Sequence, residues 1–76
     1  MKTTIYIVKE DKEREHGRIK AIVLTLSEAI SIARSLGKAR IYQQKEIKNT
    51  YYYQEMYLIN DGKVIKMKNS PLWTWL

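Results

Sequence analysis

The stretch TYYYQEMYLINDGKVIKMK, residues 50–68, decides the fold because it holds two alternating apolar runs separated by Asp61-Gly62. Asp-Gly between such runs is among the strongest sequence signals for a β-hairpin, since both residues of a two-residue turn must tolerate positive φ. The stretch therefore predicts two antiparallel strands, over residues 50–59 and 64–68.

The turn also predicts the register of this hairpin, and the register determines which side chains share a face. With a two-residue loop, Leu58 lies opposite Ile65 and Met56 lies opposite Met67. One face of the hairpin then becomes uniformly apolar. A slip of one residue would break this match.

A second hairpin is predicted at Lys48-Asn49, between the strand at residues 50–59 and an alternating run at residues 39–47. The same reasoning places Ile41 opposite Met56. The two hairpins agree on one apolar face, which a helix can cover. Its predicted members are Ala39, Ile41, Met56, Leu58, Ile65 and Met67, with Tyr52 near the hairpin end.

The opposite face, which we call the outer face, is predicted to carry aromatic and basic side chains. Its predicted members are Arg40, Tyr42, Tyr51, Tyr53, Tyr57, Ile59, Val64, Lys66 and Lys68.

The clearest helix covers residues 26–36. Thr25 is the predicted N-cap and Glu28 follows three residues later, which is the pattern of a capping box. Gly37 provides the left-handed residue that ends a helix. The apolar residues recur at the spacing of one helical stripe: Leu26, Ala29, Ile30, Ala33 and Leu36.

Two further strands are predicted before the helix, over residues 3–9 and 19–24. Apolar residues on both faces favour a central position for the first of them. The predicted fold is α+β: a single domain, residues 1–76, of order β-β-α-β-β-β, with one helix on one face of a mainly antiparallel sheet.

One helix cannot cover both faces of this sheet. Five strands about 4.8 Å apart span roughly 19 Å, whereas a helix is about 10–12 Å across. The outer face therefore remains open except where the apolar tail, residues 69–76, reaches it. That tail ends in Trp73, Trp75 and Leu76, and it can fold back over the tyrosines, extend an edge strand or await another chain.

Composition limits the classes of function. The 76-residue chain has no cysteine, which excludes disulfides and thiolate metal sites, and domains of this size often need additional stabilisation. Self-association is one source of it. No apolar run approaches the length of a membrane span, so we expect a cytoplasmic protein that does not bind membranes. The abundance of Lys, Ile and Tyr is typical of a gene from an AT-rich microbe or a mobile element.

The sequence predicts no catalytic residue, cofactor, metal ion or small-molecule substrate. His16 is the only histidine and stands in a charged stretch with no cysteine to pair with. The acidic residues of that stretch alternate with Lys12 and Arg14 and lack the spacing of a calcium loop.

The net charge of +6 favours acidic partners or serves solubility. The leading hypothesis is a non-enzymatic binding protein, of adaptor or inhibitor type, that contacts another protein or forms a homodimer through the outer face and tail. The alternative is a single-stranded nucleic-acid-binding protein that uses the same face. Packing of the tyrosines beneath the tail would explain them without any partner. The predicted contact residues are Arg40, Tyr42, Tyr51, Tyr53, Tyr57, Lys66, Lys68, Trp73 and Trp75.

Overall fold

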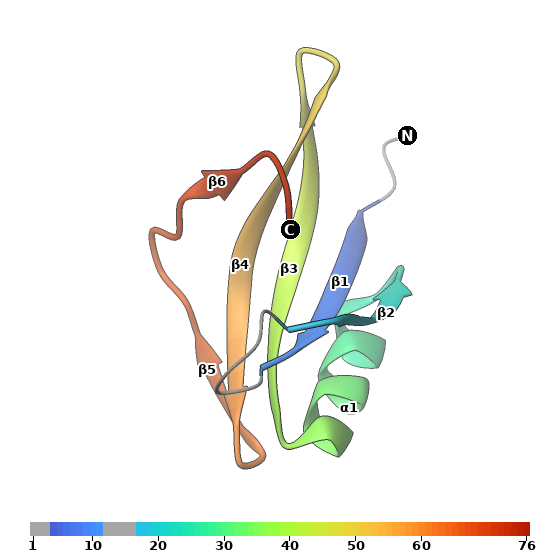
Figure 1. Cartoon of the computed structure of the whole chain (residues 1–76), viewed down its shortest axis with the longest axis vertical. Helices are drawn as coiled ribbons and strands as arrows, with labels where there is room; N and C mark the ends of the chain where they lie inside the picture. The colour runs from blue at the N-terminus through green and yellow to red at the C-terminus, as the bar shows by residue number, and fades with distance from the viewer. Residues whose placement is uncertain (1–3, 12–16) are drawn as a thin grey trace.

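The computed structural model describes residues 4–11 and 17–76. Its elements are, in chain order, β1 (Ile5–Glu10), β2 (Ile19–Val23), α1 (Leu26–Leu36), β3 (Lys38–Ile47), β4 (Thr50–Asn60), β5 (Lys63–Lys66) and β6 (Leu72–Trp73) (Figure 1). All strand pairs are antiparallel, in the order β2-β1-β3-β4-β5, and β6 pairs with β4. The α+β prediction is confirmed, including the central position of β1. The short strand β6 is an addition to the predicted order.

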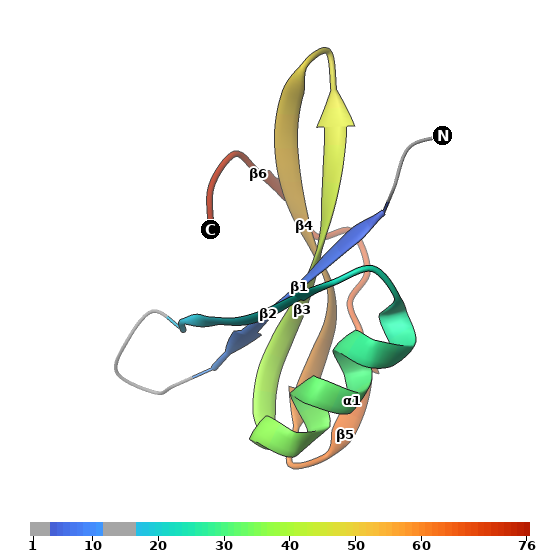
Figure 2. The ribbon, with the colours of Figure 1, turned by 90° about the vertical axis from the view of Figure 1, so that its right-hand side faces the viewer.

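Helix α1 begins and ends where its sequence predicts. The backbone N–H of Glu28 donates to Thr25 Oγ1 at 3.2 Å, and Gly37 has φ of 83° as the residue after the last turn. The helix packs on β1, β2 and β3, on one side of the sheet (Figure 2). Its alanines allow this close approach, and together with the sheet they form a core of fully buried side chains: Val8, Ala29, Ala33, Ala39, Ile41 and Ile59.

Both predicted two-residue turns are present. Lys48 and Asn49 have φ values of 50° and 65°, and Asp61 and Gly62 have 50° and 83°. Positive φ at both central residues is the signature of the turn whose twist matches that of the flanking strands. The predicted register of the β4–β5 hairpin is confirmed, because Leu58 pairs with Ile65 and Tyr57 with Lys66.

The β3–β4 register is confirmed near the turn but shifts by one residue in the middle of the hairpin. Gln44 pairs with Tyr53 and Tyr42 with Glu55, as predicted, whereas Ile41 pairs with Tyr57 instead of Met56. Met56 is therefore an extra residue on β4. Such a β-bulge reverses the face on which every later residue of the strand lies.

The bulge overturns the predicted faces beyond residue 56. Ile59 is fully buried in the core, and Tyr57 and Val64 pack against that core on the helix side. Lys66 shares this side because it pairs with Tyr57. The assignments of Leu58 and Ile65 to the helix-covered face, and of Tyr57, Ile59, Val64 and Lys66 to the outer face, were wrong. Those of Ala39 and Ile41 are confirmed.

The C-terminal tail combines two of the predicted possibilities. Strand β6 extends the edge of the sheet by pairing with β4, where Tyr53 lies opposite Trp73. The chain then turns back across the sheet, so that the C-terminus lies on the side away from α1 (Figures 1 and 2). Trp73 and Trp75 thus reach the outer face.

Candidate protein-binding surface

The tail and the central strands together form a small aromatic hollow on the outer face. It has a volume of about 180 Å³ and is lined by Lys9, Tyr42, Trp73, Trp75 and Leu76, which we call the tail surface. The two tryptophan rings meet edge to face, with centroids 6.2 Å apart and an angle of 61° between their planes. The ammonium group of Lys9 lies 6.0 Å from the centroid of the Tyr42 ring, a cation–π distance.

These tryptophans remain largely exposed although they contact each other. Trp73 keeps 46% of its surface exposed and Trp75 keeps 67%. A pair of large aromatic rings left in water is costly for a monomer, and such surfaces mark sites of interaction.

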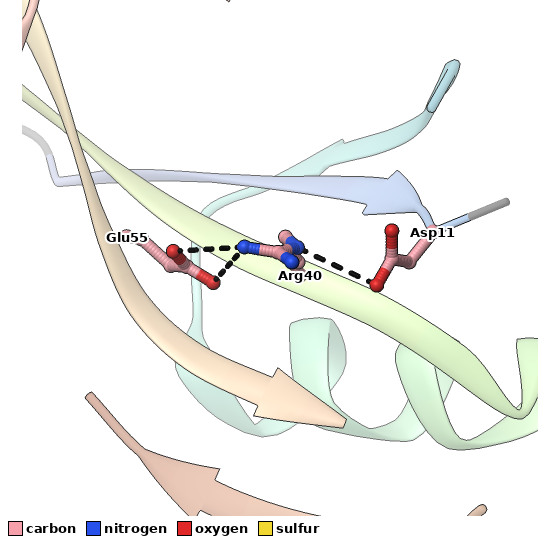
Figure 3. Close-up of polar contacts among 3 residues, drawn as sticks. All are labelled: Asp11, Arg40 and Glu55. Atoms are coloured by element: carbon pink, nitrogen blue, oxygen red, sulfur yellow. Dashed lines mark hydrogen bonds and ion pairs between the residues drawn. The ribbon is translucent and has the colours of Figure 1, made fainter. Parts of the chain in front are cut away.

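An ion-pair network occupies the outer face on strands β3 and β4 (Figure 3). The Arg40 guanidinium donates through one nitrogen to both carboxylate oxygens of Glu55, at 3.1 and 3.3 Å. Its Nε lies 3.5 Å from Asp11 Oδ2. The Glu55 side chain is 13% exposed, so this contact is the better shielded of the two.

The network influences two pKa values. Burial alone would lower the pKa of the Arg40 guanidinium, but the carboxylates of Glu55 and Asp11 outweigh burial and raise it. The pKa of the Tyr42 phenol is raised, chiefly by burial and then by the negative charge of Glu55. Arg40 therefore stays charged but is occupied by carboxylates, and Tyr42 stays neutral.

A second apolar group lies on the same face at strand β2. Ile19 pairs with Lys9 and Ile22 pairs with Ile7, so both isoleucines lie on the outer face, and Leu24 directly follows the strand. All three are exposed, with Ile22 at 63%. We call Ile19, Ile22 and Leu24 the aliphatic row.

The structure brings together only part of the predicted contact set. Arg40, Tyr42, Tyr53, Trp73 and Trp75 lie on the outer face, and Tyr51 is exposed near the tip of the β3–β4 hairpin. Tyr57 and Lys66 lie on the helix side. Lys68 is exposed and follows the end of β5.

Sequence reasoning missed several members of this face. Lys9 and Leu76 belong to the tail surface and were not among the predicted contacts. Alternation along β1 is the signal that could have placed Lys9: because Val8 faces the helix, its neighbour Lys9 must face the outer side, together with Ile5 and Ile7. A return of the tail over the tyrosines was one of three predicted courses, and no sequence signal selected among them.

Within residues 4–11 and 17–76, no group of three or more His, Cys, Asp or Glu side chains could hold a metal ion. His16 lies outside the described residues. Within the same described ranges, no helix has the length and apolar character needed to cross a membrane.

Comparison of the chain with protein-family models, curated proteins and solved structures finds no match to any of them.

Proposed function

We propose that this chain is a non-catalytic binding protein that engages another protein through the tail surface and the neighbouring outer face. The observation that carries the proposal is the exposed Trp73–Trp75 pair beside Tyr42 on an open sheet face. Tryptophan, tyrosine and arginine are the residue types enriched where proteins bind one another. We place this activity in the cytoplasm, where a chain without cysteine functions without disulfides.

The charges on this face support a protein partner over a polyanion. Arg40 is the central cation of the face, and two carboxylates already accept its hydrogen bonds or ion pairs. A phosphate that approached Arg40 would meet the negative charges of Glu55 and Asp11. A partner with an apolar, largely uncharged contact surface meets no such opposition.

Single-stranded nucleic acid is the competing partner. Tyr53 and Trp73 pair across β4 and β6 and present rings on which bases could stack. The basic side chains proposed to contact phosphates are fewer than the sequence suggested, because Lys66 lies on the helix side and Arg40 is already paired. The outer face therefore supports this function less well.

The experiment uses a photoreactive residue at the centre of the proposed surface. We would replace Trp75 with p-benzoylphenylalanine in cells that express the natural gene, irradiate them and digest the adducts with protease or nuclease. The proposal expects an adduct that protease destroys and nuclease leaves unchanged. A nuclease-sensitive adduct, or none, would overturn it.

Ser31 provides the matched control. It is exposed on α1, on the other side of the sheet, so the same photoreactive residue there should not form the adduct. Adding Trp73→Ala to the photoreactive variant should reduce the yield severalfold, because it removes the neighbouring ring that shapes the surface. Equal yields from positions 75 and 31 would indicate nonspecific labelling and count against the proposal.

A further inference from the structure

Strand β2 is an open edge of the sheet. It pairs only with β1 among the described strands, so the backbone N–H and C=O groups along its other side are available to another strand. The edge also carries the aliphatic row on the outer face. A free strand edge with exposed apolar side chains is a template for pairing with a second strand.

The opposite edge of the sheet carries features that discourage such pairing. Strand β5 is four residues long and has exposed lysines at both ends, Lys63 and Lys66. Strand β6 also pairs with β4, at Tyr53 and Gln54, and so covers a further part of the β4 edge. Short length, lysines and coverage by another segment are the means by which proteins protect strand edges. Strand β2 is five residues long and carries one lysine, Lys20, which is the extra residue of a β-bulge. The edge that β2 offers for pairing is therefore the regular stretch of residues 21–23.

We propose that β2 pairs in antiparallel fashion with β2 of a second copy of this chain, with Ile22 on the two-fold axis. This inference rests on the proposed function, protein binding, because it names a second copy of the chain as one protein partner. The contact it proposes lies at the β2 edge and not at the tail surface. The pairing joins the sheets of two copies into one continuous sheet and places their aliphatic rows side by side.

The sequence of β2 matches itself in this register. Ile22 lies opposite Ile22 of the second copy on the outer face. On the helix side, the small Ala21 lies opposite the larger Val23. Lys20, the extra residue of the β2 bulge, falls near the neutral Leu24 at the end of this pairing, so the two lysines do not face each other. If Ala21 lay on the axis instead, Lys20 would face Ile22.

Charge favours a second copy over an acidic strand at this edge. Of the fourteen lysines and arginines in the chain, β2 holds one, so an acidic partner would gain little there. Two copies that each carry +6 repel one another through the rest of their surfaces. Salt screens that repulsion, with a Debye length of about 8 Å at physiological ionic strength. Dimerisation should therefore strengthen as salt rises, whereas binding to a polyanion should weaken.

The test exploits the absence of cysteine in the chain. Ile22→Cys places a single thiol on the two-fold axis, where opposed Cβ atoms lie about 4.5–5.5 Å apart and a disulfide can form with a small adjustment. Ile65→Cys is the matched control, since Ile65 is also an exposed isoleucine, 44% exposed, on the far edge strand. Under mild oxidation we expect the Ile22→Cys dimer to form at least about tenfold faster, because pairing raises the local thiol concentration. Equal rates would overturn the proposal.

Light scattering of the unmodified chain and of Ile22→Lys provides the second measurement. The unmodified chain should approach twice its monomer mass as concentration rises, and more readily at higher salt. Ile22→Lys places two cations opposite each other and should keep the chain monomeric. Ile22 is 63% exposed, so an unchanged helical circular dichroism spectrum should accompany the change. A monomeric unmodified chain, or a dimeric Ile22→Lys variant, would overturn the proposal.

The proposed pairing at the β2 edge and the proposed binding at the tail surface can be tested independently of each other. Ile22→Lys should abolish the dimer and preserve the photoadduct at position 75. Trp75→Ala should preserve the Ile22→Cys disulfide. If the dimer forms but no protein adduct appears at position 75, the proposed function fails while the edge pairing stands.

Discussion

The two faces of one sheet differ in what covers them. On the helix side, α1 packs against β1, β2 and β3, and the side chains beneath it are fully buried. On the outer face, the described chain supplies only its C-terminal tail, and large side chains such as Ile22, Trp73 and Trp75 remain exposed. Folding stability should therefore come chiefly from the first face, and recognition from the second.

The difference follows from how the described chain is divided between strands and helix. Among the described residues, 11 form the helix α1, and that helix covers only part of one face. Large apolar side chains that stay exposed on the other face either lower the solubility of the protein or form a binding site for a partner.

The largest expected effect comes from a truncation in the helix-covered core. Ile41 is fully buried, so Ile41→Ala should lower the free energy of unfolding by about 2–5 kcal/mol. Ile65→Ala, on an exposed isoleucine, should cost less than about 1 kcal/mol. Urea denaturation of both variants measures the contrast. Equal losses would mean that the outer face contributes to stability as much as the core does.

Deleting Met56 tests the bulge that separates the two faces. The deletion removes the one β4 residue without a partner on β3 and retains the Tyr42–Glu55 and Ile41–Tyr57 pairs. It also removes the hydrogen bond from Met67 N–H to the Met56 carbonyl, 3.0 Å long. We expect a loss of about 1 kcal/mol in the free energy of unfolding, measured by urea denaturation.

If the register is continuous and β4 has no bulge, the same deletion should cause a much larger loss in the free energy of unfolding. In that case Leu58 would lie on the helix-covered face, and the deletion would turn it outward and cost at least as much as Ile41→Ala. Cross-strand nuclear Overhauser effects between residues 41 and 57, retained in the variant, provide the direct check.

The ion-pair network should contribute little to stability. Arg40 and Asp11 are partly exposed, and such pairs are typically worth about 0–1 kcal/mol. Glu55→Gln preserves the shape of the side chain and removes the charge that holds Arg40. We expect a change below about 1 kcal/mol in urea denaturation. In an oligonucleotide titration, release of Arg40 should strengthen binding at low salt if nucleic acid contacts this face, and no change would count against that contact.

Alkaline pH gives the smallest expected effect. Burial and the Glu55 charge raise the pKa of the Tyr42 phenol, so the neutral ring favours the folded state. This stabilisation is complete below the unfolded pKa of about 10 and is lost as pH rises through the folded pKa. The free energy of unfolding should thus fall with pH above about 10, and less steeply in Tyr42→Phe. Urea denaturation across that range gives both slopes, and parallel slopes would contradict the role of Tyr42.

Local patterns predicted most of the elements because each depends on neighbouring residues. Thr25, Glu28 and Gly37 fix the ends of α1 through hydrogen bonds and backbone freedom within one turn. Lys48-Asn49 and Asp61-Gly62 fix the two hairpins in the same way. The Met56 bulge could not be predicted, since the apolar residues at positions 56, 58, 65 and 67 fit a continuous register equally well. Burial of Ile59 in the core, with Val64 packed against that core, favours the other choice.

The candidate surface was only partly predictable for the same reason. The sequence placed Tyr42 and Tyr53 on one face because they lie on the turn side of the bulge, where the register is local. Arg40 lies beyond the bulge but keeps its predicted face, because the extra residue is on β4 and not on β3. The sequence misplaced Tyr57 and Lys66, which lie beyond the bulge. The course of residues 74–76 over Tyr42 and Lys9 depends on contacts between residues distant in the chain.

The amino-acid sequence by itself determined the strands, the helix with its ends and both tight turns. It also determined that one helix cannot cover both faces of the sheet, so that apolar and basic side chains remain on the other face. Only the tertiary structure decided which face each side chain occupies beyond Met56, where the tail lies and which cation is already paired. The physical reason is that turns and caps are set by interactions within a few residues. Faces and surfaces are set by the burial of apolar area across the whole sheet, where one inserted residue reverses every side chain after it.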